Sequence, residues 1–195
     1  MKLAVFDFDG TITRKDTFIE FIRYAKGNNR FWWGIILFAP VLVGFKLKLI
    51  PNWKAKQLLF RYYFNGMSIN EFNSLCVGFA ARINKMVRPK ALAAIKKHKS
   101  EGDVLLIVSA SIENWIAPWA AENGFIKVIS TKLEVDNNNL ITGNFATKNC
   151  YGIEKKIRLE AAFPERSKYI LTVYGDSEGD RELMDYADHS FLNPF

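Results

Sequence analysis

Three apolar segments that each end in polar residues constrain the fold of this chain more than any other feature. They lie at residues 2–8, 104–108 and 169–174, and the second is an uninterrupted run of aliphatic side chains. An unbroken apolar run of this length is typical of a strand buried on both faces, as in the centre of a parallel sheet. Most stretches between the segments show helical periodicity, while residues 133–145, with turn signals at 136–139, resemble a hairpin. The sequence therefore predicts an α/β fold with a doubly wound parallel sheet.

The residues that follow these segments are the candidates for chemistry. Asp7 and Asp9 lie at the end of the first segment, Ser109 follows the second, and Asp176 and Asp180 follow the third. The carboxyl ends of parallel strands meet at one edge of the sheet, where ligands bind. Carboxylates that converge there repel one another unless a cation is present, and hard oxygen ligands of this kind suit Mg²⁺. We therefore expect a magnesium site built from the four aspartates.

Residues 14–88 differ from the rest of the chain in charge and in aromatic content. They hold 13 Lys and Arg against three Asp and Glu, a net charge of +10, whereas the remaining residues carry a net charge of −3. They also contain 15 of the 28 aromatic residues. This shift predicts a basic, aromatic-rich module at 14–88, inserted into a core formed by 1–13 and 89–195.

Composition narrows the class of protein and its compartment. With 49% hydrophobic and 24% charged residues, the chain is globular, and two cysteines in 195 residues exclude a disulfide framework. Asp7 comes too early for the apolar region of a signal peptide, and no apolar run reaches the roughly 20 residues that span a bilayer. We therefore expect a cytoplasmic protein.

The order and spacing of the polar segments resemble a known superfamily. Its four motifs match DFDGT at 7–11, SAS at 109–111, a lysine before a helix, and GDSEGD at 175–180. Together they look like the haloacid dehalogenase superfamily of phosphohydrolases, and the spacing is similar to its phosphoserine phosphatase-like branch, subfamily IB. The resemblance covers 3–17 and about 100–195. It implies a Rossmannoid core with a helical cap inserted after the first motif, at 14–88.

The resemblance implies a role for each aspartate. Asp7 resembles the nucleophile, whose carboxylate attacks phosphorus and forms an aspartyl phosphate. Asp9 resembles the general acid and base, and its backbone carbonyl is a Mg²⁺ ligand in the family. Asp7 and Asp176 are the expected side-chain ligands. Asp180 is expected to act on the metal through water or to orient the lysine.

The resemblance also implies a phosphate-binding set, which comprises Thr11, Ser109, Ala110 through its N–H, and Lys155. Lys155 has the branch spacing, with Leu159 four residues later, while Lys156 and Lys148 remain alternatives for the phosphate lysine. We expect Ser111 to cap the following helix. We expect His98, which lies among lysines, to be on a solvated helix face.

These expectations predict an enzyme, a Mg²⁺-dependent phosphatase that hydrolyses a phosphomonoester through an aspartyl-phosphate intermediate. The alternatives are a phosphatase of small soluble phosphoesters such as phosphoserine, and a non-catalytic adaptor that binds a membrane or a partner. A phosphotransferase would use the same intermediate, and the sequence does not distinguish it from a phosphatase. The SAS and GDSEGD segments depart from the phosphoserine phosphatase pattern, which puts phosphoserine itself in doubt. The sequence does not indicate an oligomeric state.

The apolar segment 31–45 is flanked by Arg30, Lys46 and Lys48, and it bears on what the cap binds. As a helix, its fifteen residues reach about 22 Å, short of the roughly 30 Å core of a bilayer. The segment is therefore either buried in the cap or interfacial, with 31–48 against an anionic membrane on its inner face. This character is similar to the bacterial phosphatidylglycerophosphate phosphatase of the superfamily and suggests a lipid phosphate. No nucleic-acid module is recognisable, so nucleic acid is not expected as a partner.

Overall fold

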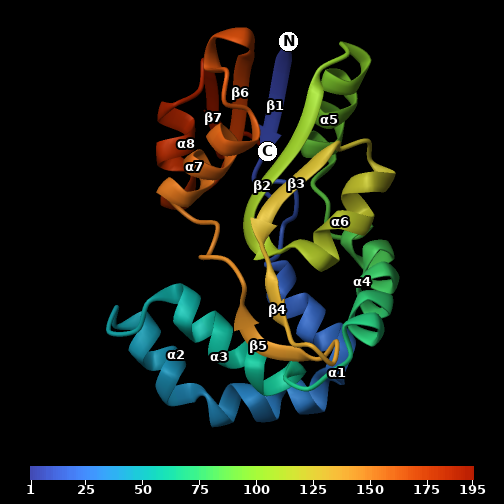
Figure 1. The fold of residues 1–195 in the computed structure, drawn as a ribbon, viewed down its shortest axis with the longest axis vertical. Coiled ribbons are helices and arrows are strands. Elements are labelled where there is room, and N and C mark those ends of the chain that lie inside the picture. Colours follow the sequence, from blue (N-terminus) through green and yellow to red (C-terminus); the bar gives the residue numbers. More distant parts are fainter.

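The core of the protein is a five-stranded parallel sheet with the strand order β3-β2-β1-β6-β7 (Figure 1). The structure is a computed structural model that describes all residues, 1–195. The strands are β1 (Lys2–Phe6), β2 (Val104–Ile112), β3 (Lys127–Thr131), β6 (Ile170–Gly175) and β7 (His189–Leu192). The three apolar segments thus form the three middle strands.

Helices cover both faces of this sheet. The helices α5 (Pro89–Ser100) and α6 (Glu113–Glu122) lie on one face, and α7 (Ile153–Ala162) and α8 (Arg181–Asp185) lie on the other (Figure 1). Side chains of β1 alternate between the faces: Phe6 packs in the cluster that contains Trp115 of α6, and Val5 packs in the cluster that contains Leu159 of α7. The predicted doubly wound α/β fold is confirmed. A 3₁₀ turn (Arg166–Lys168) precedes β6.

Four further helices lie beyond the carboxyl ends of the strands. They are α1 (Thr17–Leu37), α2 (Ala39–Lys46), α3 (Asn52–Phe64) and α4 (Ile69–Asn84) (Figure 1). The helix α1 bends at Gly27, whose φ of 77° is readily adopted only by glycine. The apolar segment 31–45 therefore forms the second half of α1 and most of α2. No helix of the protein combines the length and apolar character needed to cross a membrane.

The two connections between this helical layer and the core lie side by side. Thr13 and Val87 form an antiparallel bridge. On either side of it, the Arg14 N–H donates to the Met86 carbonyl at 2.9 Å, and the Arg88 N–H donates to the Ile12 carbonyl at 2.8 Å. The chain thus leaves and re-enters the core at one place, which is the arrangement expected of an inserted module.

The predicted hairpin over 133–145 is present and reaches from the core to the cap. It consists of β4 (Leu133–Val135) and β5 (Ile141–Phe145), which pair antiparallel (Figure 1). The N–H of Gly66 donates to the Ile141 carbonyl at 2.8 Å, and the Gln57 side-chain amide donates to Asn144 Oδ1 at 2.9 Å. The hairpin follows β3 in the chain, yet it packs with α3 as part of the cap layer.

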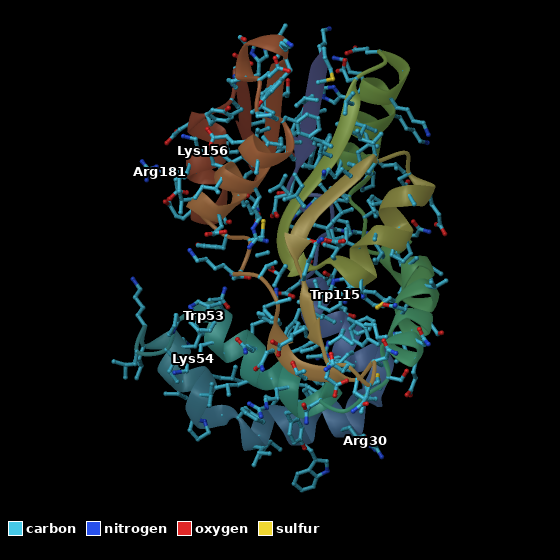
Figure 2. The ribbon with its side chains drawn as sticks, viewed as in Figure 1. Arg30, Trp53, Lys54, Trp115, Lys156 and Arg181 are labelled. Carbon is cyan, nitrogen blue, oxygen red and sulfur yellow. The ribbon has the colours of Figure 1, made fainter.

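An aromatic cluster joins the cap to the core. The Phe21 ring of α1 stacks on Trp115 of α6 at 4.9 Å between centroids, and it lies 5.2 Å from both Phe72 and Phe79 of α4. Phe21 and Trp115 are fully buried. Figure 2 shows Trp115 between the sheet and the cap helices. Burial of these rings holds the cap in place over the carboxyl ends of the strands.

We expect Phe21→Ala to lower the free energy of unfolding by about 3–5 kcal/mol, because it removes a buried ring and leaves a cavity between α1, α4 and α6. Urea unfolding measures this change. Val77→Ala is the matched control, since Val77 is on α4 but is 64% exposed. A loss for Phe21→Ala no larger than that of the control would contradict the packing described here.

Candidate active site

The loop after β1 carries the first two aspartates to the edge of the sheet. Asp7 directly follows β1, and its N–H donates to the Tyr174 carbonyl of β6 at 2.9 Å. Gly10 then turns the chain with a φ of 85°. A Cβ atom at Gly10 would lie 2.0 Å from Asp176 Oδ2, so only glycine allows this loop to approach the carboxylate of Asp176 so closely.

A buried lysine lies between two of the predicted carboxylates. The Lys155 ammonium is 2.7 Å from Asp7 Oδ1 and 2.5 Å from Asp180 Oδ1, and all three side chains are buried. Lys155 is in the first turn of α7, which is oriented toward the sheet edge by Leu159 one turn later in the core. This ion-paired group brings together the first motif, at 7–11, and the fourth motif, at 175–180.

The two alternative lysines lie elsewhere. Lys156 pairs with Glu160 at 3.8 Å and is on the outer side of α7, as Figure 2 shows. Lys148 pairs with Glu154 at 3.4 Å, and its side chain is 83% exposed. Of the three candidates, the structure brings only Lys155 to the aspartates.

Three carboxylates at this edge are close enough to share a cation. Oxygen atoms of Asp7, Asp176 and Asp180 all lie within 4.8 Å of one another. The Asp180 Oδ2 atom is held by the N–H groups of Asp176 and Ser177 at 3.2 and 3.1 Å, and the Thr11 hydroxyl donates to Asp176 Oδ1 at 3.4 Å. One ammonium group does not balance three carboxylates, and carboxylate oxygens are the ligands that Mg²⁺ prefers. The side chains present therefore fit a magnesium ion.

The pKa values of these groups reflect burial beside like charges. Burial raises the pKa of Asp7 to about 7, although the Lys155 charge opposes the shift. Burial and the Asp180 charge also raise the pKa of Asp176. Burial alone would lower the pKa of Lys155, but the carboxylates of Asp7 and Asp180 outweigh it, so the net shift is upward and the lysine stays charged.

Asp9 is held apart from this cluster. Its Oδ1 atom accepts the Thr17 N–H at 2.7 Å, and its Oδ2 atom accepts the Ser111 hydroxyl. Burial, together with the Asp16 charge, raises the pKa of Asp9, while the Lys56 charge lowers it. A carboxyl group with a raised pKa that two donors hold in place suits proton transfer.

The expectation that Ser111 caps a helix is wrong. Strand β2 continues through Ser111 to Ile112, and Ile112 precedes α6 without any side-chain cap. Ser111 instead donates to Asp9, because the extended backbone directs its hydroxyl to the sheet edge. No pattern in the sequence distinguishes this hydroxyl from an ordinary helix cap, since both follow a strand and precede a helix.

The carboxyl-terminal part of β2 is contacted by a cap residue that sequence reasoning missed. Ser109 is buried, and its hydroxyl accepts the Ser111 N–H at 3.2 Å. The Ala110 carbonyl accepts both the Lys56 ammonium and the Thr131 hydroxyl, each at 3.1 Å. Lys56 is in α3, so the cap places a positive charge beside the predicted phosphate-binding segment.

A cavity of about 630 Å³ opens between α3 and residues 145–154. Its lining includes Trp53 and Gln57 of α3 and Asn149 and Tyr151 of the facing loop. The Thr131 hydroxyl lies 3.3 Å from Asn149 Oδ1 and 3.1 Å from the Ala110 carbonyl oxygen, so one hydroxyl connects the cavity wall to the phosphate-binding segment. The cavity therefore adjoins the segment that was predicted to bind phosphate.

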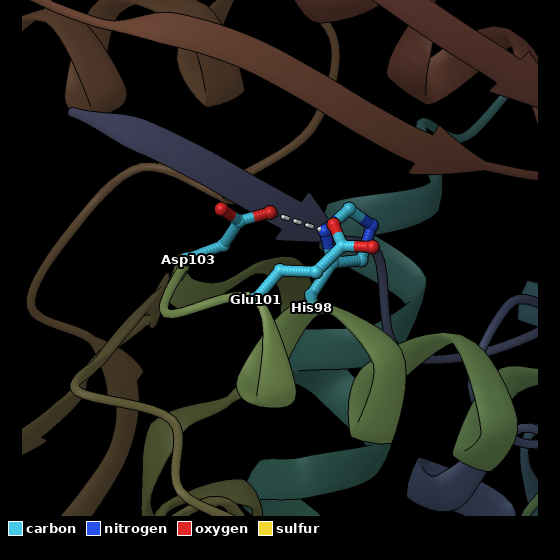
Figure 3. Close-up of side chains that lie close together, drawn as sticks. All are labelled: His98, Glu101 and Asp103. Atoms are coloured by element: carbon cyan, nitrogen blue, oxygen red, sulfur yellow. Dashed lines mark hydrogen bonds and ion pairs between the residues drawn. The ribbon is translucent and has the colours of Figure 1, made fainter.

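A second group of titratable side chains has a structural role. His98 Nδ1 is 2.7 Å from Asp103 Oδ2, and His98 Nε2 is 2.8 Å from the Tyr174 hydroxyl, with Glu101 nearby (Figure 3). The expectation of a solvated His98 is wrong, because the ring is buried against Phe6 on the sheet. Both ring nitrogens already have hydrogen-bond partners, so this group ties α5 to the sheet.

Comparison with known proteins agrees with this geometry. The family model described as haloacid dehalogenase-like hydrolase matches residues 4–185. Protein CicA of Caulobacter vibrioides is 31% identical over 187 residues, which cover 95% of this chain and 83% of CicA. The chain belongs to the haloacid dehalogenase-like hydrolase family, so the predicted superfamily is confirmed.

Solved structures share the fold over nearly the whole chain. A protein of unknown function from Bordetella pertussis Tohama I has a TM-score of 0.85 at 18% identity and covers 100% of this chain, with 91% of its own length matched. A substrate-bound phosphoserine phosphatase has a TM-score of 0.69 at 17% identity, with 98% of this chain and 85% of that chain covered. The similarity to the phosphoserine phosphatase branch thus includes the cap.

We expect the stability difference between Asp7→Asn and the wild type to depend on pH. The folded-state pKa of Asp7, about 7, lies above its ordinary value of 3.8. Between these values the unfolded chain releases this proton while the folded protein keeps it, so the wild type loses stability as the pH rises. The variant lacks this titrating group and does not lose that stability. Its free energy of unfolding relative to the wild type should therefore rise by on the order of 2–4 kcal/mol between the two pH values.

Urea unfolding of both proteins in chelator at the two ends of this pH range measures the difference. The chelator keeps divalent cations from masking the charge on Asp7. A difference that stays constant with pH would contradict a raised pKa at Asp7.

Proposed function

We propose that the protein is a Mg²⁺-dependent phosphatase that hydrolyses a phosphomonoester through an aspartyl phosphate on Asp7. The observation that carries this proposal is the buried Lys155, which lies between Asp7 and Asp180 beside Asp176. Solved structures of similar fold include a substrate-bound phosphoserine phosphatase and a phospho-aspartyl intermediate analogue of such an enzyme. These neighbours support the reaction class, and family membership supports hydrolysis.

In the first half-reaction, Asp7 attacks phosphorus. A bond forms between a carboxylate oxygen of Asp7 and phosphorus, and the bond from phosphorus to the leaving oxygen breaks. The protonated Asp9 donates its proton to that oxygen, which leaves as an alcohol. Lys155, held by two carboxylates, neutralises charge on the phosphoryl oxygens, and Ser109 with the Ala110 N–H and Thr11 binds them. The hydrogen bonds from Thr17 and Ser111 orient Asp9 for this transfer.

In the second half-reaction, Asp9 acts as a base. It takes a proton from a water molecule, whose oxygen attacks phosphorus and breaks the bond to Asp7, so that inorganic phosphate leaves. Both halves use one side chain in its two protonation states. The raised pKa of Asp9, caused chiefly by its burial, supports this role.

Magnesium would be held by the carboxylates of Asp7 and Asp176 and by the Asp9 carbonyl. Asp180 would act on the ion through water. The ion supplies positive charge that lets the anionic Asp7 approach an anionic phosphate. Asp180 meanwhile holds Lys155 and is itself fixed by two backbone N–H groups. The fit of three neighbouring carboxylates supports Mg²⁺ as the cofactor.

For the substrate we propose a lipid phosphate, with the protein acting at the cytoplasmic face of a membrane. The support is the cavity beside Ala110, which Trp53, Phe145 and Tyr151 line with aromatic surface. Trp53 is 46% exposed, so the wall of the cavity includes an aromatic side chain that solvent also reaches. A panel of phosphate-release assays that compares lipid phosphates in detergent with soluble phosphoesters tests this choice. Faster turnover of phosphoserine than of any lipid phosphate would refute it.

We expect Asp7→Asn to lower kcat by at least roughly 10³-fold, because an amide is a poor nucleophile. Lys155→Gln should lower kcat by roughly 10²–10³-fold through loss of charge stabilisation. The matched control is Lys156→Gln, which should change kcat by no more than about twofold. Phosphate release from para-nitrophenyl phosphate measures all three. Equal losses in the two lysine variants would contradict the assignment of Lys155.

Magnesium should be required, and Asp176→Ala should weaken its binding. A loss of at least about tenfold in affinity is expected, since even residues behind metal ligands contribute that much. Glu178→Ala is the control from the same loop, because Glu178 is exposed and pairs only with Arg181. Isothermal titration with Mg²⁺ gives both affinities. Full activity in excess chelator would rule out the metal-dependent mechanism.

A further inference from the structure

Helix α2 is an apolar helix that the protein does not bury. Its sequence is APVLVGFK, and none of its residues is buried. It continues a surface on which exposed apolar side chains gather: nine of the twenty large exposed hydrophobic residues lie within 32–53. They are Trp32, Trp33, Ile36, Leu37, Val43, Phe45, Leu47, Leu49 and Trp53, here called the apolar rim. Large exposed apolar surfaces are typical of interaction sites.

The segment that carries the rim is anchored on its inner side. Phe31 and Gly34 are buried, and the Tyr63 hydroxyl of α3 donates to the Phe31 carbonyl at 2.8 Å. A Cβ atom at Gly34 would lie 1.8 Å from that hydroxyl, so the helices are in close contact there. Trp32 and Trp33, in contrast, are 53% and 69% exposed. The segment is therefore partly buried in the cap: its inner side packs there, whereas the side that carries both tryptophans is exposed.

Most of the rim lies at one end of the molecule. The second half of α1 and α2 lie toward the end farthest from the amino-terminal ends of the strands (Figure 1). Helix α3 begins beside α2, on the side of the cap that faces residues 145–154 of the core. Figure 2 shows Trp53 and Lys54 at the start of α3, beside α2. Because Trp53 also lines the cavity at the cap–core junction, the rim reaches the mouth of that cavity.

The charge around the rim identifies its partner. Residues 21–70 contain eight Lys and Arg and no Asp or Glu. Arg30, Lys46, Lys48 and Lys54 are exposed, and none of them forms an ion pair within the protein. A second copy of this chain would bring the same positive charges together. An anionic lipid surface instead complements them, and tryptophan favours the interface between headgroups and acyl chains.

We propose that the apolar rim docks on an anionic membrane, with the rim side chains in the interface and the flanking lysines against lipid headgroups. Docking in this way brings the mouth of the cavity beside Trp53 to the bilayer, where a phosphomonoester carried by a lipid enters toward Asp7. The inference deepens the proposed function by naming where its substrate resides, and in this respect it rests on that function. Membrane binding itself needs no turnover, so it is measured separately.

Vesicle sedimentation tests the docking. The protein should bind vesicles of phosphatidylcholine mixed with phosphatidylglycerol and bind pure phosphatidylcholine vesicles much less. Raised salt should weaken the binding, because the Debye length falls from about 10 Å at 0.1 M to about 3 Å at 1 M. No binding to the anionic vesicles at low salt would overturn the proposal, as would equal binding to both lipids.

Paired variants assign the binding to the rim. Trp32→Ser with Trp33→Ser should weaken vesicle binding by at least roughly tenfold, whereas Val77→Ser with Ile126→Ser, equally exposed elsewhere, should not. Lys46→Gln with Lys48→Gln should weaken it about fivefold for each charge removed. The matched control is Lys2→Gln with Lys127→Gln, which changes the net charge equally on the core.

Membrane docking and the proposed phosphatase function can fail independently, and the measurements distinguish the two cases. Hydrolysis of para-nitrophenyl phosphate by the tryptophan variant should equal that of the wild type, because neither tryptophan belongs to the proposed catalytic site. If the wild type is active but does not bind vesicles, only the docking proposal is overturned. If it binds vesicles but is inactive, only the proposed function is overturned. If the tryptophan variant does not fold, the Lys46→Gln, Lys48→Gln variant provides the test instead. Vesicle binding by this variant as strong as that of the wild type refutes the proposal. The proposal is also refuted if the wild type is a dimer that binds no vesicles and the tryptophan variant is a monomer.

Discussion

The ammonium group of Lys155 lies between the carboxylates of Asp7 and Asp180, away from solvent. Removing charges from water costs several kcal/mol for each ion, and only close pairing with further hydrogen bonds offsets that cost. The fold supplies the partners: Asp7 at the end of β1, Asp180 held by backbone N–H groups after β6, and Lys155 in the first turn of α7. The register of β1 and β6 places Asp7 beside the turn that carries Asp180, and α7 packs on the same sheet through Leu159, so the site depends on the sheet.

The fold itself was largely predictable because its strands are buried on both faces. Continuous apolar runs at β1, β2 and β6 are possible only where helices cover both sides of a sheet, and the structure has helices there. Asp7, Asp176 and Asp180 were likewise expected at one edge, because the strand ends of a parallel sheet converge. Lys155 was the choice that the family resemblance implied, with Lys156 and Lys148 as alternatives. Local sequence carried this information since each residue directly follows a strand or begins a helix.

Contacts between distant segments were not predictable in the same way. Lys56 is one of many cap cations, and only the packing of α3 over the sheet edge brings its ammonium to the Ala110 carbonyl. His98 lies among lysines in the sequence, yet Asp103 and Tyr174 bury it. The hairpin of β4 and β5 was visible as a turn pattern, but its attachment to the cap depends on hydrogen bonds with 66–69. Each of these features depends on tertiary proximity rather than on local pattern.

The central claim is that Asp7 carries the phosphoryl group during turnover. Borohydride reduces an aspartyl phosphate to the alcohol, which converts the aspartate to homoserine. The account predicts that protein quenched with borohydride during turnover of para-nitrophenyl phosphate contains homoserine at position 7, identified by tandem mass spectrometry of the peptide. The Asp7→Asn protein should show none. Homoserine at position 9, 176 or 180 instead, or steady turnover with no reduced aspartate at all, would contradict the account.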